Sequence, residues 1–444
     1  MARDLPKTEE KNSTFAFFLL ILYTASVLIR PHEMFLVSVE WITIKIFTIL
    51  ALVTTIAAQR PIKLLPQHWM MLALVPLIII SGFLNGSGMI GIDQSQRILI
   101  SVIIPLFLFS NCISTIKRQH ILMVICLIAA MLMVHNGHVQ QYASQGFGWA
   151  LGTHSVGYIN LGERRITYLG FFNDPNDLGM FLVMNIPFAI YFYKKGTAIK
   201  KLLMLGILSA LLYGIYLTGS RGTMLGAGAL IGVYLVVMNA GPKLFLAIVA
   251  LAPIAATVIS SLQSNIDESA DGRLEAWYAG ILMLMSNPVF GVGVGRFFEE
   301  HGLVAHNSFI HVAGELGVPG YSLWGGALVF TVLTGYLIIR DQIRNNKLTD
   351  ADKIIRNKDE ADELLLNKTL FFSLIGFMIT GFFISRMFTL LLFIFMGMTI
   401  ASHFRLFKIN PAYAIHFTKQ IALKSMLYCW SIIVAVYIAL KLGL

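Results

Sequence analysis

Charged residues are scarce in this sequence, and the shortage defines the class of protein. Asp, Glu, Lys and Arg make up 13% of the 444 residues and hydrophobic residues make up 57%, whereas a soluble globular protein carries roughly 25% charged residues. Apolar segments fill nearly the whole chain, so we expect one integral membrane domain over residues 1–444 rather than several soluble domains. The formal charge of +10 is spread over short loops, which does not indicate nucleic acid as a partner.

Cysteine and processing signals are scarce too. Cys112, Cys126 and Cys429 all lie within apolar stretches and have neither metal-binding nor disulfide spacing, so we expect them to be packing residues. No cleavage site follows the apolar segment 15–29, which we therefore expect to remain as an uncleaved first membrane span. No Asp and His residues cluster at metal-ligand spacing. We accordingly expect no metal and no cofactor.

Long apolar segments are what the sequence has in abundance. A helix needs about 20 apolar residues to cross a bilayer, and roughly 12–13 segments approach that length. The sequence therefore predicts an all-α, polytopic transmembrane helical bundle. The expected spans are 15–29, 35–58, 69–84, 98–116, 121–136, 178–193, 202–218, 224–239, 244–262, 309–339, 370–385, 390–403 and 421–440.

The distribution of lysine predicts the orientation of the bundle. Lysine pairs and clusters fall in alternate loops on the side of the N-terminus, and such loops are typically cytoplasmic. The other side carries single basic residues, almost all arginine, and two longer loops, 138–168 and 263–308. The stretch 340–368 is strongly charged with nearly balanced, periodic signs, and we expect it to be a solvated amphipathic linker helix in the cytoplasm.

Two isolated arginines on the outer side are candidate site residues. Arg221, in YLTGSRGTMLGAG, lies where two spans meet almost without a loop, and an arginine at membrane depth normally faces a partner or a cavity. The alternative is an arginine that reaches the lipid headgroups. Arg273 opens a predicted amphipathic helix on the outer surface, with Asp271 as its cap and Pro288 at its end. The helix dipole disfavours a cation in the first turn of a helix. Arg273 therefore either serves something other than the helix or is an arginine exposed in a loop.

The stretch AHNSFIHVAGELGVPG places polar residues at the start of an apolar span that Gly and Pro then interrupt. A neutral His306 can act as a general base near pH 7, although a polar interfacial histidine is the alternative. Glu315 follows His311 by four residues, so a structural Glu–His pair is equally well supported. We therefore keep Glu315 outside the catalytic core.

Two further stretches carry polar groups on the outer side. In YLGFFNDPNDLGMFL, Asp174 and Pro175 predict a helix start; alternatively the carboxylates orient nearby arginines. Arg164 and Arg165 could contact an anionic ligand or lipid headgroups. The run GVGVGRF lacks the βαβ unit of a nucleotide-binding site, so we expect flexible backbone beside a long ligand instead.

These stretches together resemble the O-antigen ligase and O-antigen polymerase superfamily of bacterial membrane glycosyltransferases. The resemblance covers residues 168–320 well, whereas the first and last spans are supported by hydropathy alone. The residues that carry it, in order along the chain, are FNDPNDLG (172–179), TGSRG (218–222), GRLEAW (272–277), NPVFGVGVGRF (287–297) and AHNSFIHVAGELGVPG (305–320).

The resemblance implies a GT-C-like fold and a metal-independent transfer of a glycan from a polyprenyl diphosphate, such as undecaprenyl diphosphate, to an acceptor sugar at the periplasmic face of the inner membrane. It implies that Arg221 and Arg273 bind the diphosphate and that His306 is the essential histidine. The expected substrate-binding residues are Arg164, Arg165, Asp174, Asn176, Arg296, Asn307 and Glu315.

Alternatives remain at this level. Ligase and polymerase share these residues and differ in the acceptor, which is lipid A-core for a ligase; the modest outer loops favour the ligase. A carrier-lipid or glycan transporter would also use outer arginines, but it would not need a base and typically shows an internal repeat, which is not evident here.

Overall fold

The computed structural model describes residues 11–34, 41–156, 164–239, 251–252, 254–255, 268–346 and 358–443. Across these residues the fold is all-α, and the only β contacts are isolated bridges. The predicted fold class is therefore confirmed. The helices are α1 (Thr14–Leu28), α2 (Thr43–Ala58), α3 (Pro66–Leu84), α4 (Gly88–Ile98), α5 (Ile104–Cys112), α6 (Ile116–Tyr142), α7 (Pro175–Lys195), α8 (Ala198–Leu217), α9 (Arg221–Asn239), α11 (Glu268–Ser286), α12 (Phe297–His301), α13 (Ser308–Asn346), α14 (Lys358–Gly381), α15 (Leu390–Ile409), α16 (Lys419–Tyr428) and α17 (Trp430–Gly443).

The described residues contain nine helical segments that are long and apolar enough to cross a membrane, so the chain is a multi-pass membrane protein. Each overlaps a predicted span, although the bounds differ, as for Gly88–Cys112 against the predicted 98–116. Two further predicted spans are shorter apolar helices, α1 and α2, and the span predicted at 178–193 lies within α7. The span predicted at 244–262 falls almost entirely outside the described residues.

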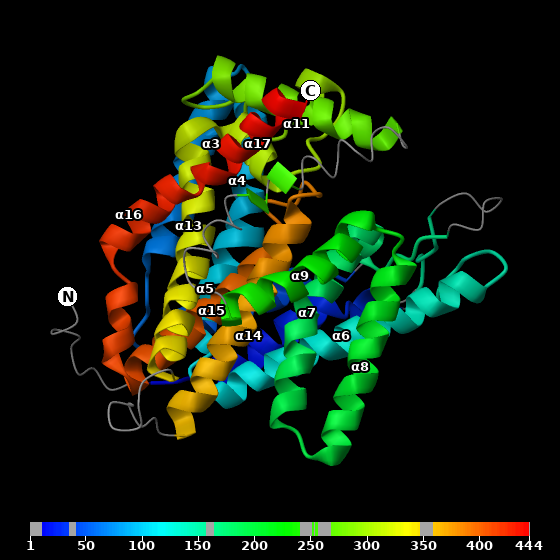
Figure 1. Ribbon diagram of the computed structural model, residues 1–444, viewed down its shortest axis with the longest axis vertical. Helices are drawn as coiled ribbons and strands as arrows, with labels where there is room; N and C mark the ends of the chain where they lie inside the picture. The colour runs from blue at the N-terminus through cyan, green and yellow to red at the C-terminus, as the bar shows by residue number, and fades with distance from the viewer. Residues whose placement is uncertain are drawn as a thin grey trace.

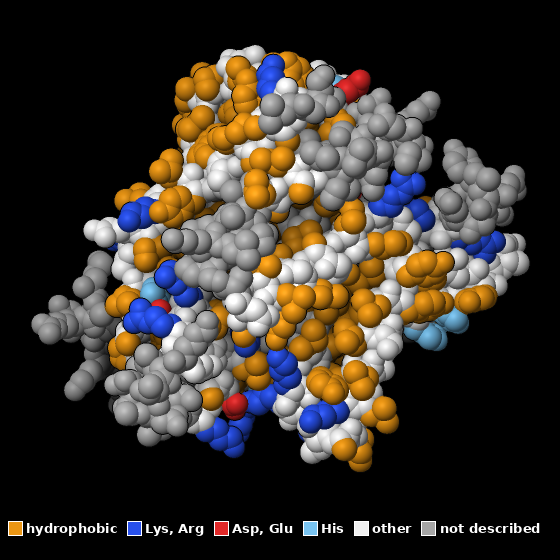
Figure 2. Space-filling view, viewed as in Figure 1, with side chains coloured by type: hydrophobic (Ala, Val, Ile, Leu, Met, Phe, Trp, Pro, Cys, Tyr) orange, Lys and Arg blue, Asp and Glu red, His pale blue; other side chains and the backbone are white. Residues whose placement is uncertain are grey.

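The surface of the bundle is apolar where helices face outward. Leu202, Leu212 and Tyr216 of α8 and Ile231 and Leu235 of α9 are all exposed, and Figure 2 shows hydrophobic side chains gathered over this part of the molecule. Soluble proteins rarely expose such continuous apolar areas, whereas lipid chains cover them at no cost. By contrast, α14 and α15 are mostly buried inside the bundle.

Helix α13 runs through the bundle and is broken at Gly317, about a quarter of the way along it, as the Gly and Pro residues predict. It packs against α3, α11, α14 and α16 (Figure 1). Gly317 has φ 64° and ψ −164°, a non-helical conformation that suits glycine. A Cβ at this position would lie 2.6 Å from the carbonyl oxygen of Pro288. The break therefore lets the loop after α11 pack directly against α13.

Helix α11 begins earlier than predicted. It starts at Glu268, so Asp271 lies inside the helix rather than at its cap. The apolar face is largely as expected, because Leu274, Trp277 and Ile281 are buried, although Met285 is 62% exposed. This face packs against α13, and α11 crosses the end of that helix in Figure 1.

The charged stretch 340–368 is divided between two helices. Its first residues continue α13 to Asn346 and its last residues form the start of α14, while 347–357 lie outside the described residues. Glu363 in this stretch is buried and pairs with Arg405, with Oε1 2.8 Å from the guanidinium. The prediction of a solvated helix is therefore wrong at Glu363, because an arginine of α15 is buried opposite it.

Candidate active site

His306 lies in the short connection between α12 and α13 and has an unusual backbone conformation. Its φ is 48°, in the left-handed region that few residues other than glycine adopt. The next residue, Asn307, is fully buried and caps α13, since its Oδ1 accepts hydrogen bonds from the backbone N–H groups of Phe309 (3.0 Å) and Ile310 (3.1 Å). The cap fixes the direction of the chain, and with it the half-buried His306 side chain.

Several charged side chains surround His306. Burial lowers the pKa of its imidazole, and the neighbouring Arg273 lowers this pKa further; Arg386 acts in the same direction, whereas Asp174 raises it. We call His306, Arg273, Asp174 and Arg386 the His306 cluster. Because the net shift is downward from about 6.5, His306 is mainly neutral at pH 7 and can accept a proton.

Arg386 connects the His306 cluster to two helix starts. Its Nε lies 2.6 and 2.7 Å from the two carboxylate oxygens of Asp177, and its Nη2 lies 3.3 Å from Asp174. Its backbone N–H donates to the Ser308 hydroxyl (2.9 Å), which in turn donates to the carbonyl of Ile384 (2.5 Å). The α14–α15 connection is thereby tied to the first residues of both α7 and α13.

The start of α7 is built as the sequence predicts. Asp174 is the N-cap, its Oδ1 accepts a hydrogen bond from the backbone N–H of Asn176 (2.8 Å), and Pro175 occupies the first helical position. Asn176 also accepts a hydrogen bond from the guanidinium of Arg165 (3.0 Å), whose Nε donates to the carbonyl of Thr218 (2.8 Å). Arg165 therefore joins α7 to the turn that precedes Arg221.

Arg221 is the first residue of α9 and is exposed. The turn before it contains Gly219, which has φ 59° and packs against Arg165. A Cβ at Gly222 would lie 2.8 Å from the side chain of Phe383, three residues before Arg386. The start of α9 thus lies beside the same connection that holds the starts of α7 and α13. Helix N-termini carry partial positive charge, which the carboxylates of Asp174 and Asp177 offset at the start of α7.

Two of the predicted substrate-binding arginines make other contacts. The guanidinium of Arg164 caps the end of α6 by donating to the carbonyls of Ala143 (2.5 Å) and Ser144 (2.8 Å). Arg296 pairs with Glu299 (3.1 Å) and donates to the carbonyl of Asn85 (2.7 Å). Their roles in substrate binding stay predictions, and these contacts do not favour them.

Glu315 supports the glycine-rich loop. It is 1% exposed and lies 3.0 Å from the Nε2 of His311, which confirms the predicted pair. The same carboxylate oxygen accepts hydrogen bonds from the backbone N–H groups of Gly295 (2.9 Å) and Phe297 (3.1 Å). The loop is therefore held against α13, which makes a flexible backbone there a poor description. The described residues contain no group of three or more His, Cys, Asp or Glu side chains placed to hold a metal.

Arg386 was not among the site residues predicted from the sequence. The contacts above are made across 209 and 212 positions of the chain, and no local pattern reports such a separation. One feature of the sequence could have pointed to Arg386. An arginine between two apolar spans requires a partner, and the carboxylates at the start of α7 lie at the same level of the bundle.

We expect Arg386→Ala to reduce both the stability of the protein and the glycan transfer that the family resemblance implies. The change removes the arginine partner of the Asp177 carboxylate, which is 2% exposed. A buried acceptor that is left without a hydrogen bond lowers the free energy of unfolding by about 1–3 kcal/mol, and by more when the acceptor is charged. The measurement is the midpoint of thermal unfolding in detergent, alongside the transfer rate. Adding Asp177→Asn should recover the midpoint but not the rate. A normal rate in Arg386→Ala would remove Arg386 from the site.

A match to a known family covers the part of the chain that contains three of the candidate site residues. Residues 205–325 match the family model of the O-antigen ligase domain, a segment that includes Arg221, Arg273 and His306. No curated protein matches the chain. The match supports the O-antigen ligase superfamily for residues 205–325.

Proposed function

We propose that this protein transfers a glycan from a polyprenyl diphosphate carrier to an acceptor sugar, with lipid A-core as the acceptor, at the periplasmic face of the bacterial inner membrane. The observation that carries the proposal is the His306 cluster. A half-buried histidine with a lowered pKa lies among cationic side chains, beside the converging starts of three apolar helices. The matched family and the membrane-spanning architecture agree with this function.

The chemistry requires a neutralised leaving group and a base. The acceptor hydroxyl attacks the anomeric carbon of the donor sugar, the bond from that carbon to the diphosphate oxygen breaks, and the diphosphate leaves with the electron pair. Arg221 and Arg273 bind the diphosphate, because a guanidinium is always charged and matches phosphate oxygens in pairs. Fixed cations in a partly dry site stabilise the charge that develops on the leaving oxygen.

His306 takes the proton of the acceptor hydroxyl. Its lowered pKa keeps the ring neutral at pH 7, which is the form that a general base needs. Asp174 and Arg386 act as positioning residues, since their ion pair joins the start of α7 to the connection beside His306. The proposed reaction uses no metal, and transfer should continue in the presence of a chelator.

The polymerase of the same superfamily is the second candidate function. It would use the same arginines and histidine, with a second carrier-linked glycan as the acceptor. A transporter would bind the carrier but would form no new glycosidic bond. The His306 cluster favours an enzyme over a transporter, because a transporter has no need for a neutral base among cations.

Purified protein incubated with the carrier-linked glycan in EDTA, with and without lipid A-core, tests the proposal. We expect a glycan–lipid A-core conjugate when lipid A-core is present and no lengthened carrier-linked glycan in its absence. Lengthened glycan without lipid A-core would favour the polymerase. No covalent product with either acceptor, in EDTA or with added divalent metal, would contradict an enzymatic function.

The topology gives a separate prediction. The native cysteines are buried, so cysteines introduced at positions 264 and 346 can be labelled selectively. In intact cells we expect a membrane-impermeant maleimide to label position 264 and to reach 346 only after permeabilisation, because the lysine-rich loops face the cytoplasm. Labelling at 346 without labelling at 264 would invert the orientation and place the His306 cluster on the wrong side.

A further inference from the structure

A cluster of aromatic and imidazole rings lies where α6 ends. We call it the aromatic surface, and it consists of His135, His138 and Tyr142 of α6, Trp149 of the connection 143–156 that follows, and Tyr213 of α8. His135 and His138 are three residues apart and therefore share one face of α6. The His135 ring centroid lies 6.2 Å from that of Trp149, and the His138 centroid lies 4.7 and 5.9 Å from those of the two tyrosines. Figure 1 shows the end of α6 reaching past α8 to the edge of the molecule, and Figure 2 shows histidine and hydrophobic side chains together at that edge.

The rings of the aromatic surface are exposed rather than part of the core. Tyr142 is 75% exposed, Trp149 39% and Tyr213 37%, and both histidines are exposed. A hydrogen bond of 2.9 Å joins the Nδ1 of His138 to the hydroxyl of Tyr213. The surface therefore offers flat apolar faces with nitrogen and oxygen atoms at their edges, and such side chains give a large contact area at a small cost in conformational entropy.

The connection after α6 is built to hold Trp149 in place. Asn136 is fully buried, and its Oδ1 accepts a hydrogen bond from the backbone N–H of Ala150 (2.9 Å) while its Nδ2 donates to the hydroxyl of Thr153 (3.2 Å). Gly148 packs directly on the amide group of Asn136, where a Cβ would clash. A surface that is ordered before a ligand arrives loses little conformational entropy when the ligand binds.

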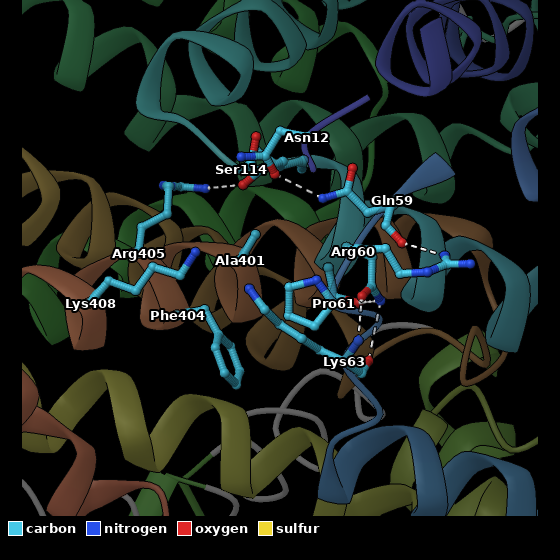
Figure 3. A pocket seen from close by; sticks show the side chains of 13 residues that line it. Asn12, Gln59, Arg60, Pro61, Lys63, Ser114, Ala401, Phe404, Arg405 and Lys408 are labelled. Carbon is cyan, nitrogen blue, oxygen red and sulfur yellow. Dashed lines mark hydrogen bonds between the residues drawn. The ribbon is translucent and has the colours of Figure 1, made fainter. Parts of the chain in front are cut away.

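The aromatic surface contains no carboxylate, lysine or arginine. Residues 119–162 include no Asp, Glu, Lys or Arg at all, whereas the pocket drawn in Figure 3 is lined in part by Arg60, Lys63 and Arg405. Phosphate-bearing lipid headgroups are attracted to basic residues, which the aromatic surface lacks. Rings with hydrogen-bonding edges suit a neutral sugar instead, because a sugar ring has apolar C–H faces and hydroxyl groups at its edge.

The aromatic surface is connected to the candidate active site through Arg165. Val156, at the end of the connection after α6, exchanges two backbone hydrogen bonds with Arg165, 2.9 and 2.8 Å long. The guanidinium of Arg165 contacts Asn176 at the start of α7 and the carbonyl of Thr218 in the turn before Arg221. A glycan whose diphosphate lies at Arg221 therefore has the connection after α6 beside it.

We propose that the aromatic surface binds neutral sugar units of the donor glycan, several units away from the carrier diphosphate. The proposal rests on the proposed function, since it assigns a second contact to the same donor. The rings cover the C–H faces of the sugars and displace water from both surfaces, while the imidazole and phenol groups bond the hydroxyls.

The alternative occupant is the bilayer interface, where exposed Trp and Tyr side chains commonly gather at the ends of membrane helices. Trp149 lies beyond the end of α6, in a connection whose backbone is held by the buried Asn136. This placement and the missing basic residues favour the sugar.

Binding of free glycan tests the contact without any transfer step. The probe is the glycan chain released from its carrier by mild acid, and its affinity for the full chain in detergent is measured by saturation-transfer NMR. We expect wild type to bind it, and Tyr142→Ala with Trp149→Ala to bind it about tenfold more weakly, the effect of losing two ring contacts. Trp41→Ala with Tyr428→Ala, at positions that are 62% and 50% exposed, removes the same two rings elsewhere and should leave the affinity unchanged.

Substitutions at Trp149 separate ring stacking from general apolar contact. Trp149→Phe keeps a flat ring and should retain most of the affinity, whereas Trp149→Leu keeps apolar area without a flat face and should lose it. The proposal is overturned by equal affinities of these two variants, by equal losses in the Trp41/Tyr428 control, or by a wild type that does not bind the free glycan.

Two donors of different length separate this proposal from the proposed function. The Tyr142/Trp149 variant should lose about tenfold more kcat/KM with a long-chain donor than with a donor that carries a single repeating unit, because only the long chain reaches the rings. Failure of wild type to transfer either donor would contradict the proposed function, and the binding measurement would still decide the aromatic surface. Equal effects of the variant on both donors would overturn the aromatic surface as a glycan site.

Discussion

His306→Ala is expected to lower the rate of single-turnover transfer by about 10²–10⁴-fold at saturating carrier-linked glycan, the usual effect of removing a general base. Binding of the carrier should change little, because the cations that bind the diphosphate remain. In wild type, kcat/KM should fall with decreasing pH, with a midpoint below about 6.5. Burial and Arg273 lower the pKa of His306, so the ring stays neutral further into the acid range.

Asp174→Asn gives an internal check on this pH dependence. The Asp174 carboxylate raises the pKa of His306, so its neutralisation should move the acid limb of kcat/KM to lower pH. Asparagine caps a helix as well as aspartate does, so α7 should keep its start. If the acid limb of kcat/KM stays at the same pH in Asp174→Asn, a group other than His306 controls it.

His311→Gln is the matched control for His306. His311 pairs with Glu315 inside the protein, and glutamine can still donate a hydrogen bond to that carboxylate. We expect near-normal transfer in this variant. If His311→Gln is inactive while His306→Ala is active, the wrong histidine has been assigned. If both are active, the base mechanism fails, and positioning by the arginines must account for the reaction.

Arg221→Ala and Arg273→Ala should each lower transfer by about 10²–10³-fold, the range for losing one group that stabilises developing charge. Lysine at either position should recover little activity, because its point charge cannot replace a paired contact to phosphate. Arg97→Ala is the matched control, since Arg97 is exposed on α4 and paired with Asp93. The measurements are the transfer rate and the affinity for the carrier-linked glycan.

The two arginine variants also separate folding from function. Arg221 is exposed and Arg273 is half-buried, so neither replacement leaves a large cavity, and both proteins should insert with normal helix content. Near-normal transfer in either alanine variant would remove that arginine from the site. Equal losses in Arg97→Ala would point to a general effect of surface charge.

The sequence predicts the local features of this protein well. Alternation of long apolar runs with short basic loops is sufficient for the multi-pass helical fold. The cap at Asp174, the break at Gly317 and the His311–Glu315 pair each depend on residues within a few positions of one another. Such features follow from helix geometry and from the conformational preferences of Gly and Pro.

Features that depend on packing could not be predicted from the sequence. The contact between Arg386 and Asp177 joins α7 to the α14–α15 connection, and hydropathy does not say which spans are neighbours. The same limit explains Glu363, which sequence analysis assigned to a solvated linker and which is buried against Arg405. Arg164 and Arg296 were predicted to bind substrate, but they make contacts with the carbonyls of Ser144 and Asn85 that hydropathy could not predict.

We propose that the His306 cluster catalyses displacement of a diphosphate by an acceptor hydroxyl. The most direct test is one single-turnover experiment in EDTA that counts two products, the new glycan conjugate and the released polyprenyl diphosphate. For wild type we expect equal amounts of both products, and for His306→Ala we expect bound donor with both products forming about 10²–10⁴-fold more slowly. Formation of both products by His306→Ala at the wild-type rate, or release of the diphosphate without conjugate in wild type, would contradict this mechanism.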